Sequence, residues 1–89
     1  MKTIWKYQLT FNDLNEIEIP KGGKVLSFGN QFDVGCLWAM VDPEAEKEKR
    51  RFRIFGTGHP IEISVNLDYI GTAQFDGGNL IFHLFEEKF

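Results

Sequence analysis

Short runs in which polar and apolar residues alternate make up much of this chain, and turn-forming residues separate them. Residues 3–10 alternate Trp, Tyr and Leu with Lys and Gln, and residues 51–55 alternate Arg with Phe and Ile. Because successive side chains on a strand point to opposite faces of a sheet, these runs predict half-buried β-strands. The sequence therefore predicts an all-β fold, a compact antiparallel sandwich or small barrel of about seven to eight short strands with at most one helical turn.

Other segments are assigned from the same signals. Cys36–Val41 is nearly all apolar, which predicts a central strand buried on both faces. The acidic and basic residues of 44–50 are good helix formers without an apolar stripe, so we expect a solvated hairpin connection there, with at most one helical turn. The remaining expectations are strands at 14–19 and 24–29, a loop at 30–35, an extended piece at 61–65, and a hairpin of 69–75 with 79–86 across Asp76–Gly78.

Length and charge limit the classes of function. At 89 residues, the chain is expected to form a single domain over 1–89. A net charge of −3 argues against general nucleic-acid binding, which needs a broad basic surface. Cys36 has no partner for an internal disulfide, and we interpret it as a small buried hydrophobic residue. Without an apolar run long enough to span a membrane, a cytoplasmic protein is expected.

The last apolar segment predicts self-association. Leu80–Phe85 is apolar on both faces apart from His83, and a domain of this size has a small core. An exposed apolar face commonly marks an interface, so we expect a homo-oligomer. His83 itself is interpreted as a core or interface histidine whose polar atoms are satisfied.

A polar turn framed by glycines is the best candidate for a binding site. Gly56–His59 follows the alternating strand, and Arg51 and Arg53 share one face of that strand. Backbone N–H groups beside glycines can converge on an anion, which the guanidinium groups would help to neutralise. An aromatic side chain could stack on a base. The predicted ligand-binding residues are Arg51, Arg53, Gly56, Thr57, Gly58, His59 and Trp5.

The same turn also fits a tight hairpin connection that binds nothing. It lacks the GK[ST] sequence and the following helix of a phosphate-binding P-loop, and it has no dinucleotide-binding fingerprint. The chain shows no nucleophile elbow, no carboxylate pair in an apolar setting and no metal-ligand spacing. We therefore expect no enzyme activity, no catalytic residues, no metal and no cofactor.

Two motifs resemble a known family. The segment CLWAMVDPEAE at 36–46 and the segment FGTGHPI at 55–61 are similar to those of small phage and prophage proteins that carry a domain-of-unknown-function label. The resemblance extends over nearly the whole chain. It implies a compact, cytoplasmic, phage-encoded accessory protein, and it brings no established activity or catalytic residues.

The resemblance and the glycine turn together suggest a function. The leading hypothesis is an oligomeric binder of a small anionic, nucleotide-like ligand that sequesters a host immune signal. The rival hypothesis is an inhibitor that binds a host defence enzyme through an acidic, aromatic face, and a third is a structural or assembly accessory protein of the phage. The direction in which the Arg51 and Arg53 side chains point distinguishes the first two hypotheses. Convergence on a pocket favours a ligand, whereas arginines spread over a flat face favour a protein partner.

Overall fold

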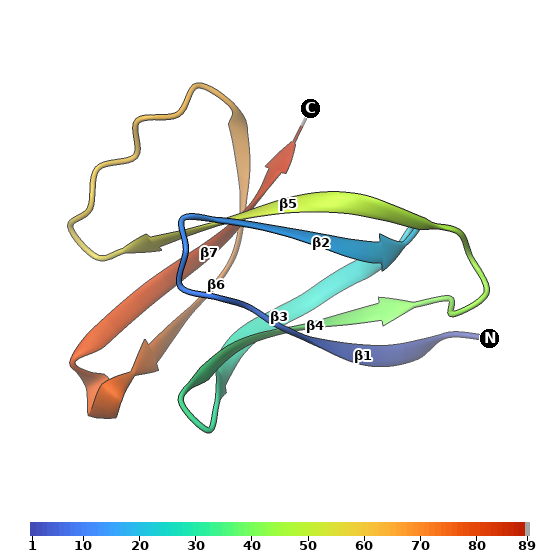
Figure 1. The fold of residues 1–89 in the computed structure, drawn as a ribbon, viewed down its shortest axis with the longest axis horizontal. Coiled ribbons are helices and arrows are strands. Elements are labelled where there is room, and N and C mark those ends of the chain that lie inside the picture. The colour runs from blue at the N-terminus through green and yellow to red at the C-terminus, as the bar shows by residue number, and fades with distance from the viewer. Residues whose placement is uncertain (89) are drawn as a thin grey trace.

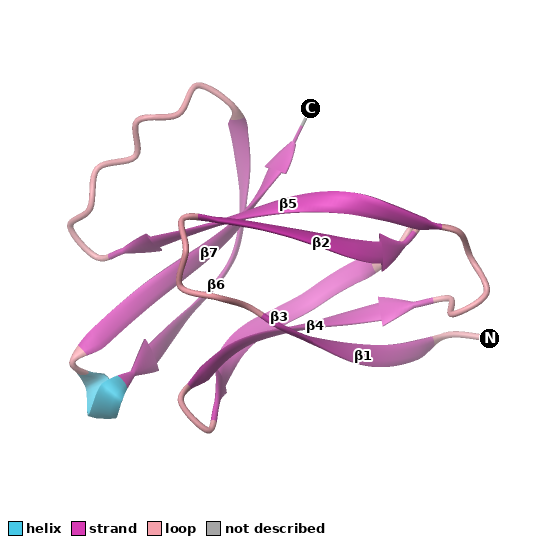
Figure 2. Cartoon of the chain, in the orientation of Figure 1, coloured by secondary structure: helices cyan, strands magenta, loops and turns pink. Residues whose placement is uncertain are grey.

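A computed structural model describes residues 1–88 as two antiparallel sheets packed against each other (Figure 1). One sheet has the strand order β1-β4-β3, and the other has the order β2-β5-β7-β6. Strands dominate these residues and one short 3-10 turn interrupts them (Figure 2). The all-β prediction is confirmed. The elements are β1 (Thr3–Gln8), β2 (Leu14–Pro20), β3 (Lys24–Gln31), β4 (Val34–Val41), β5 (Lys47–Gly56), β6 (Asn66–Phe75), η1 (Asp76–Gly78) and β7 (Leu80–Lys88).

Large apolar side chains from both sheets fill the space between them. The alternation seen in the sequence places Phe52 and Ile54 of β5 on the inner face, where Leu84 of β7 is also fully buried. Leu37, Ala39 and Val41 of β4 meet them from the other sheet. Burying an aromatic or branched side chain of this size contributes roughly 1.5–3 kcal/mol. The core therefore depends on a few large residues.

The predicted central strand does lie at the centre of its sheet. β4 pairs with β1 on one side and with β3 on the other. Its inward side chains are buried, but Trp38 and Met40 on the outward face are only partly covered. Gly29 of β3 leaves room for the Trp38 ring, because a Cβ atom there would lie 3.4 Å from it.

The charged segment before the arginines belongs to a strand. We expected 44–50 to be a solvated connection, but β5 begins at Lys47 and pairs with β2 over residues 47–53. Glu16 lies opposite Arg51 and Glu18 lies opposite Lys49, so acidic residues face basic ones across the pair. Such pairs stabilise a sheet, and no local pattern within 44–50 reveals them.

The loop expected at 30–35 is much shorter than predicted. β3 runs to Gln31 and β4 begins at Val34, so Phe32 and Asp33 alone make the turn. Both residues have positive φ, 55° and 62° respectively. Glycine and asparagine usually occupy such positions, which is why the sequence did not indicate a two-residue hairpin.

A long connection joins β5 to β6. β7 lies between these two strands in the sheet, so residues 57–65 must cross from one side of β7 to the other (Figure 1). The extended piece expected at 61–65 lies in this connection and forms no strand. The expected final hairpin is β6–β7, with η1 at its turn, and both strands extend beyond the predicted limits at their ends away from the turn.

Candidate functional site

The glycine turn lies at the end of β5. The His59 N–H donates to the Gly56 carbonyl at 3.1 Å, and the Thr57 N–H donates to the Ile81 carbonyl at 3.2 Å. Gly58 has φ +86°, which side chains with a Cβ rarely adopt. The His59 ring lies over Gly56, where a Cβ atom would be 2.7 Å from Cε1. Gly56 therefore makes space for the His59 ring, and Gly58 permits a backbone conformation that other residues rarely adopt. The turn places Thr57 and His59 near each other.

A chain of side-chain hydrogen bonds extends from this turn across the sheet. Thr57 Oγ1 lies 2.8 Å from His83 Nε2, and His83 Nδ1 lies 2.9 Å from Thr72 Oγ1. Tyr69 Oη then lies 2.6 Å from Thr72 Oγ1. Thr72 and His83 are opposite each other in the β6–β7 pair. His83 thus connects the turn to two strands. His83 was not among the predicted site residues, because the register that aligns it with Thr72 cannot be read from either strand alone.

The two predicted arginines contact the same carboxylate. On the outer face of the four-stranded sheet, Arg51 Nε donates to Glu87 at 2.5 Å, and an Arg53 guanidinium nitrogen lies 3.4 Å from it. Arg51 also contacts Glu16 at 2.9 Å. The Glu87 side chain is only 3% exposed. Arg51 and Arg53 are therefore brought together through Glu87, and neither lines the cleft at the glycine turn.

The electrostatics of this cluster follow from its contacts. Burial raises the pKa of Glu87, but the hydrogen bond from Arg51 and the charges of both arginines outweigh burial, so the pKa lies below its ordinary value. The hydrogen bond to Glu87 raises the pKa of Arg51. The carboxylate is thus held ionised, and it offsets the positive charge that a bound anion would use.

Three aromatic side chains lie beside the arginines on this outer face. Phe85 packs edge-on against Phe55, with ring centroids 5.8 Å apart, and against Tyr69 at 5.5 Å. Tyr69 is 60% exposed. We call Phe55, Tyr69 and Phe85, with Arg53 opposite Phe85, the aromatic face. Trp5, the predicted stacking residue, is in the other sheet and packs against the core.

A small cleft opens next to the glycine turn. Its volume is about 200 Å³. Its polar lining comes from Thr57, His59 and Asn79, and its apolar lining comes from the start of β7. Of the predicted site residues, Gly56, Thr57 and His59 therefore border a concave surface, whereas Gly58 and the two arginines do not line it. The lining residues are Gly56, Thr57, His59, Asn79, Leu80, Ile81 and Phe82.

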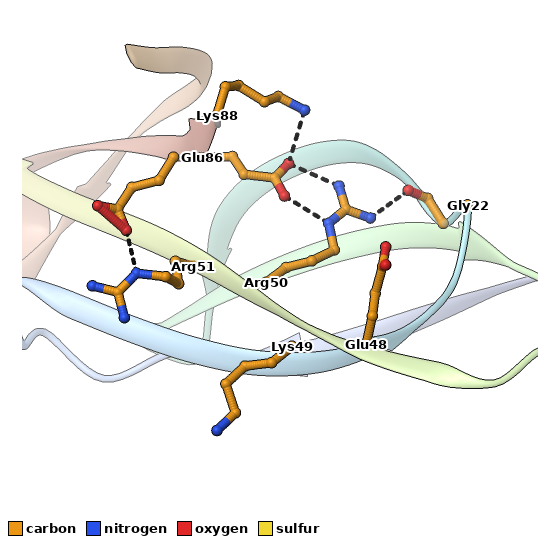
Figure 3. A pocket seen from close by; sticks show the side chains of 9 residues that line it. Gly22, Glu48, Lys49, Arg50, Arg51, Glu86 and Lys88 are labelled. Atoms are coloured by element: carbon orange, nitrogen blue, oxygen red, sulfur yellow. Dashed lines mark hydrogen bonds and ion pairs between the residues drawn. The ribbon is translucent and has the colours of Figure 1, made fainter. Parts of the chain in front are cut away.

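A second, charged hollow of about 430 Å³ lies where β7 diverges from β5. Arg50 and Glu86 form a direct ion pair in its wall, with N–O distances of 2.6 and 2.7 Å (Figure 3). Arg51, one of the predicted site residues, also lines this hollow. Arg50 also donates to the Gly23 carbonyl at 2.5 Å. The hydrogen bonds that Arg50 donates to Glu86 raise the pKa of Arg50, and burial opposes this. Because Arg50 is held by three short contacts and balanced by a carboxylate, we interpret this hollow as structural.

Two further observations concern metals and membranes. Within residues 1–88, no group of three or more His, Cys, Asp or Glu side chains is placed to hold a metal ion. The same residues contain no helix with the length and apolar character needed to cross a membrane.

The fold and its outward-facing side chains define a small all-β domain with an exposed aromatic face and a glycine-framed cleft. Over residues 1–89 the chain matches a family described as "Domain of unknown function (DUF7352)", and it belongs to that family. No curated protein and no solved structure matches it.

Proposed function

We propose that the protein is a non-enzymatic binding domain that recognises another protein through its aromatic face. The observation that carries this proposal is the pairing of Arg51 and Arg53 with Glu87 on a sheet surface beside Tyr69 and Phe85. Because Glu87 and Glu16 together offset the two guanidinium groups, the surface has balanced charge. A site for a small anion would instead leave its cations free.

The composition of the aromatic face is that of a protein interface. Aromatic residues and arginine are enriched where proteins meet, and they supply most residues whose truncation weakens binding strongly. Tyr69 combines an exposed ring with a hydroxyl fixed by Thr72, and Arg53 is fixed by Glu87. Side chains already held in place lose less conformational entropy on binding. We therefore assign Tyr69 and Phe85 as the central contacts.

The resemblance to phage proteins suggests the setting. We propose a phage-encoded accessory protein that acts in the host cytoplasm and occupies a host defence enzyme. In this role it needs no catalytic residue and no cofactor, because blocking a surface of the enzyme is sufficient.

The test compares one truncation on the aromatic face with one on the opposite sheet. Photo-crosslinking through position 69 in infected cells would first identify the partner, which is then purified. Calorimetry with the purified partner should show Tyr69→Ala binding about ten-fold or more weakly than wild type. Ile4→Ala is the matched control, because Ile4 is 56% exposed on the other sheet. Equal affinities for the two variants would refute the proposal.

A small anionic ligand at the glycine turn is the second candidate. It is supported by the cleft, which Thr57 and His59 line. At about 200 Å³ the cleft is smaller than typical ligand sites of roughly 300–1,000 Å³. It therefore suits a phosphate group or a single ring better than an entire dinucleotide.

Calorimetric titration with cyclic and linear nucleotides tests this candidate directly. If the turn binds the anion, Gly58→Val should abolish binding, because a branched side chain at φ +86° distorts the turn. Arg53→Ala should bind nearly as wild type, since Arg53 contacts Glu87 and not the cleft. Binding by wild type that only Gly58→Val removes would favour the ligand over the protein partner. The absence of any binding would eliminate the ligand.

A further inference from the structure

The turn between β3 and β4 presents a large aromatic side chain that residues 1–88 leave uncovered. Phe32 is 93% exposed and has φ 55°, in the left-handed region that bulky residues rarely adopt. Glycine or asparagine would make the same turn with less strain. A strained residue that gains no internal packing suggests that its side chain is used outside the fold.

Hydrogen bonds hold this turn rigidly against the neighbouring hairpin. The Asp33 N–H donates to Asn30 Oδ1, and the Asp76 N–H donates to Asp33 Oδ1, both at 2.8 Å. Asn30 Nδ2 also donates to the Gln74 carbonyl at 2.7 Å. The β3–β4 turn is thus fixed to η1 and the end of β6. Phe32 is therefore carried on a preorganised support, which lowers the entropic cost of docking its ring.

The cleft beside the glycine turn lies at this same end of the molecule. η1, which contacts the β3–β4 turn, leads directly into Asn79 and Leu80 of the cleft wall (Figure 1). Leu80 is 46% exposed and Ile81 is 36% exposed. A cavity of about 150 Å³ lined by such apolar side chains can hold benzene. A cleft of about 200 Å³ accordingly has room for a phenyl ring.

We propose that a second copy of this chain occupies the cleft with its Phe32, and that the first copy returns the same contact. The projecting ring and the receiving cleft lie at one end of one chain, so a two-fold axis through that end forms both contacts at once and closes the assembly as a dimer. The polar groups can pair as well. The Asp33 and Asp76 carboxylates belong to the two turns beside the ring and can accept hydrogen bonds, whereas Thr57, His59 and Asn79 in the cleft carry side-chain donors. This interface is separate from the aromatic face of the proposed function.

Sedimentation equilibrium of the full chain tests the dimer. Wild type should be dimeric at micromolar concentration, and Phe32→Asn should raise the dimer dissociation constant at least about ten-fold. Asparagine tolerates the left-handed backbone, so this variant should stay folded, which circular dichroism and urea unfolding would verify. Leu80→Glu, which puts a charge into the cleft, should also dissociate the dimer. Ile4→Asn, on the opposite sheet, should not.

Mixing the two variants separates a specific contact from general stickiness. A Phe32→Asn chain keeps an intact cleft and a Leu80→Glu chain keeps its ring, so an equimolar mixture should regain association through one of the two contacts. The mixture should therefore associate more tightly than either variant alone. A monomeric wild type, a folded Phe32→Asn that dimerises like wild type, or a mixture without recovery would each overturn the proposal.

Discussion

Replacing Glu86 by glutamine should destabilise the protein far more than the same change at an exposed ion pair. Glu86 forms two short contacts with Arg50, at 2.6 and 2.7 Å, and the two side chains are only 9% and 14% exposed. Glutamine keeps one acceptor but turns an amide N–H₂ group toward the guanidinium. The change removes one charge-assisted hydrogen bond, worth roughly 1.5–3 kcal/mol, and leaves a mostly buried cation without its counter-ion.

We expect Glu86→Gln to lower the free energy of unfolding by about 2–3 kcal/mol. For a domain of this size that corresponds to a Tm lower by roughly 8–24 °C, measurable by circular dichroism at neutral pH. Glu46→Gln is the control. It alters a pair with Lys21 at 3.5 Å in which Glu46 is 87% exposed, and its Tm should not change measurably.

The double variant Arg50→Met/Glu86→Gln tests the reasoning itself. Without the cation, no charge is left uncompensated, so the double variant should be at least about 1 kcal/mol more stable than the sum of the single effects predicts. If the effects simply add, or if Glu86→Gln matches the Glu46→Gln control, the hollow is not held by this ion pair.

Three further predictions concern stability. Because the folded-state pKa of Glu87 lies below its ordinary value, its stabilising effect is complete above the unfolded-state pKa and is lost as the pH falls through the folded-state pKa. The urea midpoint should therefore fall on acidification less steeply in Glu87→Gln than in wild type, and parallel curves would contradict this. Tyr7→Phe should leave the urea midpoint unchanged or raise it, since the buried hydroxyl has no hydrogen-bond partner among residues 1–88; a clear loss would reveal a missing partner. Gly23→Ala should cost about 1–3 kcal/mol in urea unfolding, because its Cβ would lie 2.7 Å from the fully buried Ile19, and Gly29→Ala, at 3.4 Å from Trp38, should cost less.

Local sequence patterns were sufficient to predict an element where the residues of that element alone determine its structure. The apolar run 36–41 is the centre of its sheet, and the turn at Asp76–Gly78 joins the final hairpin. Patterns failed where a distant strand decides. Residues 47–50 form a strand because they pair with β2. In that pair Glu18 lies opposite Lys49, and Glu16 lies opposite Arg51. Tertiary pairing of this kind overrides local helical preference.

The candidate site was predicted only in part for the same reason. The glycine turn has its own backbone signature, so Gly56–His59 could be located from the sequence. Whether an arginine side chain is free to bind a ligand depends on which residues of distant strands lie opposite it. Arg51 and Arg53 looked available until the C-terminal strand placed Glu87 against them. Likewise, His83 joined the turn only through its alignment with Thr72.

The order in which the strands pair has a consequence for how the chain is made. β1 pairs with β4, with Thr3 opposite Val41, and β2 pairs with β5, with Leu14 opposite Arg53. On the ribosome, neither of the first two strands can find its neighbour until the chain has grown well past it, whereas β3–β4 and β6–β7 can close as local hairpins. Folding dominated by such distant pairings is slow, in the range of milliseconds to seconds. β1 should therefore stay unpaired until β4 has been made, although it precedes β4 by about 25 residues.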